Sequence, residues 1–285
     1  MVSNNEGLLS VAMIVKDEEH NIRRALESIK DVADEIIVVD TGSTDRTPEI
    51  VKEYTDKLYF HEWQNDFSEA RNYSLQFPTC EWVLIYDADE EASEEFRKGI
   101  REFLKAQKKE INTVYLPAIS YLDIDLTKTE VASTPRIFRR GTVSYKNIVH
   151  NQAVYKPKIV HANFPLLHYG YIWTRALKKK KYERTDNLIR EHLQNANEPL
   201  ERIYYLVQLY KTESIGGYTY KKNQVAWQTL EAIQKVGQIP AIGLEFLYLF
   251  GLDCAFGGLK DMARELFDKC IQAAPQYPDP YFGMM

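Results

Sequence analysis

The first 90 residues alternate short apolar runs with segments of helical periodicity, and this alternation restricts the fold more than any other feature of the chain. Four apolar runs predict strands, at 8–15, 35–39, 57–61 and 82–86. The segments between them predict helices, at 17–30, about 48–54 and 66–77. We expect Asp17 to cap the first of these helices. Because strands separated by single helices require right-handed crossovers, the sequence predicts an α/β fold with a mostly parallel sheet and flanking helices.

Polar residues follow three of the predicted strands directly. Lys16 and Asp17 follow the first strand, Asp40 follows the second, and residues 87–90 follow the fourth. Open α/β sheets bind their ligands at the carboxyl ends of the strands. We therefore expect the functional site at this edge of the sheet.

The pattern changes after a helix expected at 93–109. The segments 113–121, 136–139 and 149–155 predict strands without crossover helices, so antiparallel pairing is expected there. From residue 172 onward the sequence predicts helices. Five residues near the end have the spacing of a tetratricopeptide unit: Leu247, Gly251, Ala263, Phe267 and Pro275. The 285 residues thus predict two domains, an α/β domain at 1–171 and an all-α, tetratricopeptide-like region at 172–285.

Charge and cysteine content restrict the class of protein. A net charge of -5 argues against nucleic acid as the main partner. The three cysteines, Cys80, Cys254 and Cys270, match neither a disulfide framework nor a zinc site, which indicates a reducing cytoplasm. The apolar run at 8–15 is too short for a membrane span and has no basic lead, so we expect neither a span nor a signal peptide.

Asp87 and Asp89 are the strongest candidates for a metal site. Two carboxylates separated by one residue can approach one divalent cation, and Mg²⁺ or Mn²⁺ bridges carboxylates to diphosphate oxygens. An isolated motif of this kind is often only a solvent-facing turn. Its place after the fourth strand favours the metal site. Asp40 either accepts a hydrogen bond from a base or a ribose, or caps its own turn.

Four segments occur in an order that resembles glycosyltransferase family 2, the inverting enzymes with the GT-A fold. These segments are V-A-M-I-V-K-D-E, V-V-D-T-G-S-T-D, W-Q-N-D-F-S-E-A-R-N and Y-D-A-D-E. The later segments P-R-I-F-R-R, V-H-N and H-Y-G-Y, followed by tetratricopeptide-like helices, are similar to a bacterial subgroup. That subgroup includes the peptide S-glycosyltransferases that modify bacteriocins.

The resemblance implies that a UDP-sugar lies across the strand ends. It assigns to this donor the residues Val15, Lys16, Asp40, Asp66, Arg71, Asp87, Ala88 and Asp89. In such enzymes the first two line the base pocket, Asp40 contacts the uridine, and Asp87 and Asp89 hold the ribose and the metal–diphosphate. Asp66 and Arg71 are placed beside the nucleotide and the diphosphate. A guanidinium matches phosphate geometry, although an exposed helix arginine is the alternative for Arg71.

The V-H-N segment departs from the family pattern, because related sequences commonly have a glutamate where this chain has Asn151. An asparagine cannot act as a general base. His150 is the nearest titratable candidate for the base, with a structural histidine as the alternative. His168 is either a further metal ligand beside Asp87 and Asp89 or a core residue.

The resemblance implies a metal-dependent, inverting transfer of a hexose or N-acetylhexosamine from a UDP-sugar. Tetratricopeptide-like helices commonly present grooves for extended peptides, which favours a peptide or protein side chain as acceptor. Two alternatives stay open: a transferase acting on a cell-envelope glycan, and a non-catalytic peptide-binding scaffold. A nucleotidyltransferase would usually have a glycine-rich basic loop after the first strand, and K-D-E-E is not one. Exposed repeat faces also allow a homodimer.

Overall fold

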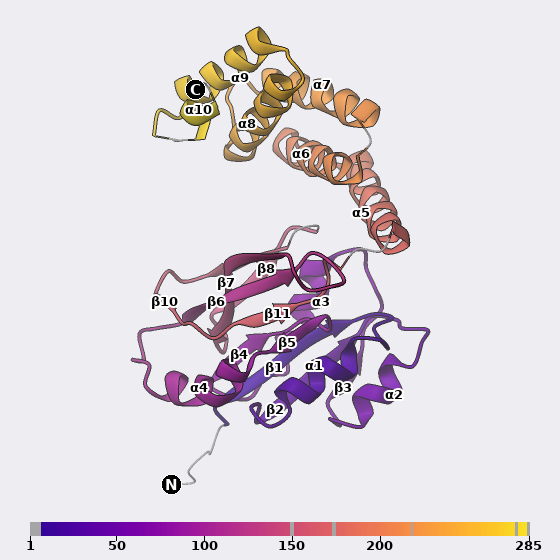
Figure 1. Cartoon of the computed structure of the whole chain (residues 1–285), viewed down its shortest axis with the longest axis vertical. Helices are drawn as coiled ribbons and strands as arrows, with labels where there is room; N and C mark the ends of the chain where they lie inside the picture. The colour runs from indigo at the N-terminus through magenta and orange to yellow at the C-terminus, as the bar shows by residue number, and fades with distance from the viewer. Residues whose placement is uncertain (1–6, 149–150, 173–174, 218, 277–278, 284–285) are drawn as a thin grey trace. The chain divides into compact units, whose positions relative to one another are not determined.

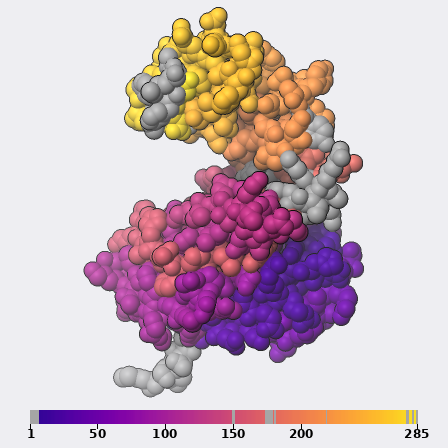
Figure 2. Space-filling view, in the orientation of Figure 1, coloured from indigo at the N-terminus to yellow at the C-terminus, as the bar shows by residue number. Residues whose placement is uncertain are grey.

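The chain forms two compact units, residues 1–174 and residues 175–285 (Figure 1). The computed structural model describes residues 7–148, 151–172, 175–217, 219–276 and 279–283. The first unit contains the sheet and the helices that cover it. The second unit consists of helices. Figure 2 shows the surface of each unit in the same colours.

The first half of unit 1 is a parallel sheet. Its strands are β1 (Leu9–Val15), β2 (Glu35–Asp40), β3 (Leu58–Phe60) and β4 (Trp82–Ile85). They lie in the order β3-β2-β1-β4, and each pair is parallel. Residues of β1, β2 and β4 are buried almost throughout, as continuous apolar runs in a two-sided sheet require. The predicted parallel sheet is confirmed.

The same sheet continues with strands that have no crossover helices. A long hairpin of β6 (Thr113–Tyr121) and β7 (Thr129–Arg139) joins it through antiparallel pairing of β7 with β4. Beyond β6 lie β11 (Leu166–His168), parallel to it, and β5 (Glu90–Ala92), antiparallel to β11. The short β10 (Ile159–His161) also pairs with β6 in parallel. The predicted antiparallel pairing is confirmed for the hairpin of β6 and β7. The strands β10 and β11, which the sequence did not predict, pair with β6 in parallel.

A two-stranded sheet of β8 (Val143–Lys146) and β9 (Gln152–Tyr155) stands apart from the large sheet. The sequence predicted the second of these strands but not β8. It also missed β5, β10 and β11. Each of these is three or four residues long, which is too short to display a period of two.

The helices of unit 1 are α1 (Ile22–Ile29), α2 (Thr47–Lys52), α3 (Phe67–Ser74) and α4 (Glu94–Lys105). The prediction that Asp17 caps the first helix is wrong. Asp17 has a positive φ of 54°, and its carboxylate accepts hydrogen bonds from the backbone N–H and the hydroxyl of Thr44. The helix begins only after Asn21. The core between α1, α4 and the sheet contains Leu26, Trp82 and Phe96.

The helices of unit 2 are α5 (Arg175–Asn195), α6 (Pro199–Gly216), α7 (Thr219–Val236), α8 (Ala241–Phe256), α9 (Lys260–Ala273) and α10 (Asp279–Gly283). The pair of α8 and α9 matches the repeat signature. A Cβ on Gly251 would lie 2.4 Å from the ring of Phe267, so the two helices approach closely at this glycine. Ala263 is buried, and α9 ends two residues before Pro275. Within the described part of the chain, no helix is long and apolar enough to cross a membrane.

The fold class is confirmed: an α/β unit with a mostly parallel sheet and flanking helices precedes an all-α region.

Candidate active site

The carboxyl ends of β1, β2 and β4 meet at one edge of the sheet. The last residues of β1 and β2, Val15 and Asp40, are direct neighbours in the parallel register. The chain leaves β4 into the turn that contains Asp87 and Asp89. Val15 is buried and Lys16 is exposed. The polar residues predicted to gather at the strand ends therefore share this edge.

Asp40 is only 1% exposed, and its two carboxylate oxygens have different surroundings. Oδ1 accepts hydrogen bonds from the backbone N–H groups of Gly42 and Ser43, each at 2.8 Å. Oδ2 is buried and has no hydrogen-bond partner among the described residues. A buried acceptor without a donor is costly. Asp40 thus caps its own turn with one oxygen, while the other oxygen accepts no hydrogen bond from the described residues.

Asp87 lies between two arginines. Arg71 donates to Oδ1 at 2.7 Å and Arg136 donates to Oδ2 at 3.2 Å. Burial alone raises the pKa of Asp87, but the two guanidinium groups outweigh burial and hold the pKa well below its usual value. Arg71 is 7% exposed, so the alternative of an exposed helix arginine is wrong.

Arg136 and Glu90 belong to the same network. The sequence placed Glu90 at the strand-end edge but gave it no role, and it did not single out Arg136. Glu90 is fully buried, accepts from the backbone N–H of Asp87 at 3.0 Å, and is paired with Arg136. Burial raises the pKa of Glu90 to about 7, although Arg136 opposes the rise. The only signal for these residues was their place in the segments P-R-I-F-R-R and Y-D-A-D-E. Together they fix the turn after β4.

Asp89 faces His168 rather than Asp87. Oδ2 of Asp89 lies 3.5 Å from Nε2 of His168, which is the last residue of β11. Burial lowers the pKa of His168, but the nearby carboxylates, Asp89 first, outweigh burial and raise it above its ordinary value. Among the described residues no group of three His, Cys, Asp or Glu is arranged to hold a metal ion. Asp89 and His168 are nevertheless a pair of donors, one oxygen and one nitrogen, of types that Mn²⁺ accepts.

The remaining predicted residues have distinct places. Asp66 caps α3, where its carboxylate accepts from the backbone N–H groups of Ser68 and Glu69. Ala88 is buried between the two aspartates. His150, the expected base, lies outside the described residues.

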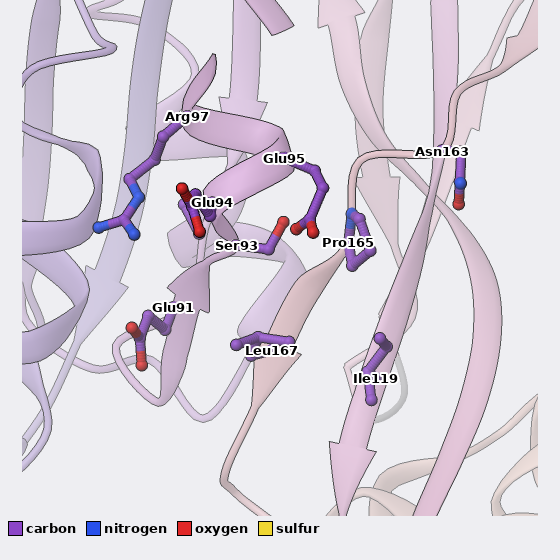
Figure 3. Close-up of a pocket in the computed structure, with 10 residues that line it drawn as sticks. Glu91, Ser93, Glu94, Glu95, Arg97, Ile119, Asn163, Pro165 and Leu167 are labelled. Atoms are coloured by element: carbon purple, nitrogen blue, oxygen red, sulfur yellow. The ribbon is translucent and has the colours of Figure 1, made fainter. Parts of the chain in front are cut away.

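A second feature is a pocket of about 410 Å³ beside β5, β11 and the start of α4 (Figure 3). Glu91, Glu94 and Glu95 line it together with apolar side chains such as Ile119 and Leu167. It contains none of the predicted donor residues and is distinct from the strand-end site.

Comparison with known proteins gives a family match over most of unit 1. The model of the family described as glycosyl transferase family 2 matches residues 10–185. Glycosyltransferase SunS of Bacillus subtilis is 32% identical over 192 residues, which are 65% of this chain and 45% of SunS. A TPR repeat-containing protein of Synechococcus elongatus is 51% identical over 83 residues, 29% of this chain and 21% of that protein. The chain thus spans less than half the length of either relative.

Among solved structures, S. aureus TarS residues 1–349 in complex with UDP-GlcNAc is similar with a TM-score of 0.49 and 16% identity. The match covers 95% of this chain and 93% of that chain.

Proposed function

The chain belongs to glycosyl transferase family 2, and we propose that it moves a hexose or N-acetylhexosamine from a UDP-sugar to a peptide or protein side chain. The observation that carries the proposal is the buried, unpartnered Oδ2 of Asp40 at the strand-end edge. Uracil has an imide N–H group, and such an oxygen can accept a hydrogen bond from it. The donor's base is therefore assigned to Asp40, with Val15 and Lys16 beside it.

Asp87, Ala88 and Arg71 are assigned to the rest of the nucleotide. The two arginines keep Asp87 ionised, and an ionised carboxylate is a good acceptor for ribose hydroxyl groups. Arg71 also brings positive charge to the side of the site where the diphosphate is expected. Asp66 acts here through α3, because its cap fixes the helix that carries Arg71.

Asp89 and His168 are the residues that would hold a divalent cation, Mn²⁺ or Mg²⁺. Their donor atoms fit the group, since Oδ2 of Asp89 and Nε2 of His168 lie 3.5 Å apart and come from separate segments, the turn after β4 and the strand β11. When bound, such a cation neutralises the negative charge of the departing diphosphate. Asp87 is the weaker candidate for a ligand, because both of its oxygens already accept from arginines.

Inversion requires one in-line displacement: the acceptor nucleophile bonds to the anomeric carbon as the bond to the diphosphate oxygen breaks. The proton of the acceptor passes to a base, and His150 is the proposed base because Asn151 cannot accept it. The peptide acceptor is supported by the helical unit and by the resemblance of the later motifs to peptide S-glycosyltransferases.

The experiment measures release of UDP from a set of UDP-sugars, with Mn²⁺ and with EDTA. The test variant is Asp89→Asn, which keeps the shape of the side chain but removes its charge. We expect Mn²⁺-dependent release in the wild type and a loss of at least about tenfold in the variant, because removing a ligand costs no less than removing a group that only orients one. A chain that neither binds UDP nor releases it would instead be the non-catalytic scaffold.

The acceptor is tested separately with one active donor. Intact-mass spectrometry of cysteine- and serine-containing peptides should show the mass of one sugar added. Transfer to a cell-envelope glycan and to none of the peptides would overturn the peptide assignment while leaving the donor assignment intact.

A further inference from the structure

Asp89 and His168 meet directly over Gly170. A Cβ placed on Gly170 would lie 2.1 Å from Oδ2 of Asp89 and 2.6 Å from Nε2 of His168. Both distances are far inside van der Waals contact, so any side chain at 170 would displace one of the two donor atoms. Gly170 is not among the residues with positive φ. Space, and not backbone conformation, therefore requires glycine at this position.

The opposite side of the His168 ring faces Ser120. Nδ1 of His168 lies 3.2 Å from Oγ of Ser120, and the two residues are direct partners in the parallel register of β11 and β6. A neutral histidine that binds a cation through Nε2 carries its ring proton on Nδ1. Oγ of Ser120 is placed to accept a hydrogen bond from this N–H group. Groups in this position orient a ligating ring and raise its basicity.

We propose that Ser120 and Gly170 are positioning residues for a divalent cation bound by Asp89 and His168. Ser120 holds the imidazole so that Nε2 faces Asp89, and Gly170 provides the space in which the carboxylate and the ring meet. This inference rests on the proposed function, because the cation belongs to the same donor site. It extends the site to two residues that do not themselves ligate.

The alternative, in which Asp89 and His168 only stabilise the fold and bind no metal, makes a different prediction. If Asp89 and His168 form only an ion pair, changes at Ser120 and Gly170 alter the stability of the fold but leave the affinity for Mn²⁺ unchanged. The affinity for the metal, and not activity, is therefore the decisive measurement.

The test is titration of the full chain with Mn²⁺ at saturating UDP, with free Mn²⁺ measured by electron paramagnetic resonance. We expect Ser120→Ala to weaken Mn²⁺ binding by about tenfold and Gly170→Ala by at least as much, as losses in the outer shell of a metal site do. Ser120→Thr keeps the hydroxyl and should retain most of the affinity.

The chain offers a matched control. Oγ of Ser133 lies 3.4 Å from Nδ1 of His161, the same kind of pair on β7 and β10, and His161 is not paired with Asp89. Ser133→Ala should leave Mn²⁺ binding unchanged. UDP binding in EDTA should be unchanged in every variant, which shows that the nucleotide site is intact.

Wild-type Mn²⁺ affinity in Ser120→Ala overturns the proposal, even if Gly170→Ala fails to fold. Loss of affinity in Ser120→Ala with recovery in Ser120→Thr supports it. A wild-type chain that binds Mn²⁺ no better than Asp89→Asn refutes the metal dependence in the proposed function, and the positioning roles with it. The two failures are distinguishable. The comparison of the wild type with Ser120→Ala tests the positioning role, and the comparison of the wild type with Asp89→Asn tests the metal site itself.

Discussion

At the scale of single residues, the three strand-end aspartates differ in the groups that surround their carboxylates. Asp40 has one oxygen satisfied by its own turn and one left without a partner. Asp87 has both oxygens bound by arginines. Asp89 faces a histidine. The same type of side chain is therefore an acceptor without a donor at Asp40, an anion held by arginines at Asp87 and a candidate metal ligand at Asp89.

Asp40→Asn separates the two oxygens of Asp40. The asparagine carbonyl can still accept from Gly42 and Ser43, so the turn should survive, while an NH₂ group replaces the orphan Oδ2. We expect UDP affinity to fall by about five- to a hundredfold in calorimetry without metal, as loss of a buried hydrogen bond costs about 1–3 kcal/mol. The exposed Asp56→Asn should bind UDP normally. Unchanged affinity in Asp40→Asn would reduce Asp40 to a turn residue.

Glu35 is the first residue of β2, at the opposite end from Asp40, and its lowered pKa makes the stability of the fold depend on pH. Burial alone raises its pKa, but Lys57, Ser10 and Thr79 outweigh burial and lower the pKa to about 2. Because the folded pKa lies below the ordinary value of 4.5, the stabilisation is complete above about pH 5 and disappears as the pH falls toward 2.

We therefore expect Glu35→Gln to lower the free energy of unfolding by about 2 kcal/mol at pH 7, which is less than the full pKa shift implies because solvent screens the pair with the half-exposed Lys57. The difference from the wild type should shrink steadily in urea titrations between pH 5 and pH 3. A difference that is independent of pH would show that the charge of Glu35 does not stabilise the fold.

At the scale of elements, α3 shows how one sequence motif performs several tasks. Its cap residue Asp66 starts the helix, and Arg71 one and a half turns later reaches Asp87. Asn72 exchanges two hydrogen bonds with the backbone of Tyr145 and so attaches β8 to the helix. The segment N-D-F-S-E-A-R-N therefore connects the strand-end site to the small sheet.

Gly251 allows a test of helix packing in unit 2. A glycine-to-alanine change in a helix ordinarily gains about 0.5–1 kcal/mol. Here the new Cβ would lie 2.4 Å from the Phe267 ring, so overpacking should cost about 1–3 kcal/mol and lower the melting temperature by a few degrees.

Combining Gly251→Ala with Phe267→Leu provides the control, because the smaller side chain relieves the clash. Thermal melts of the four proteins in this cycle should give a coupling energy of about 1 kcal/mol. Additive effects would mean that the two helices can separate at no cost.

At the scale of the whole molecule, each unit has a core of its own. The core cluster that includes Leu26, Trp82 and Phe96 contains residues from Leu9 to Leu166 only, and all the donor residues lie in the same unit. In unit 2, Tyr210 of α6 packs against Phe246 and Phe250 of α8. The candidate donor site therefore depends on elements of unit 1.

A chain of residues 1–174 should fold and bind UDP with the affinity of the full chain. Circular dichroism melts should show one cooperative transition, and calorimetry should give the UDP affinity. We expect release of UDP to persist and transfer to a peptide acceptor to be lost. Transfer at the full rate would place acceptor recognition in unit 1, and an unfolded product would show that unit 2 is required for stability.

The sequence by itself determined the parallel half of the sheet, its strand-end edge and the helical second unit. These features follow from local patterns, because apolar runs and helical periods are read from neighbouring residues. Tertiary structure alone decided that Arg136 and Glu90 join Asp87, that Asp89 turns to His168, and that glycine is required at 170. It also decided the short strands β5, β10 and β11. In each case the partner lies far away along the chain, and no local periodicity records a contact between residues that only folding brings together.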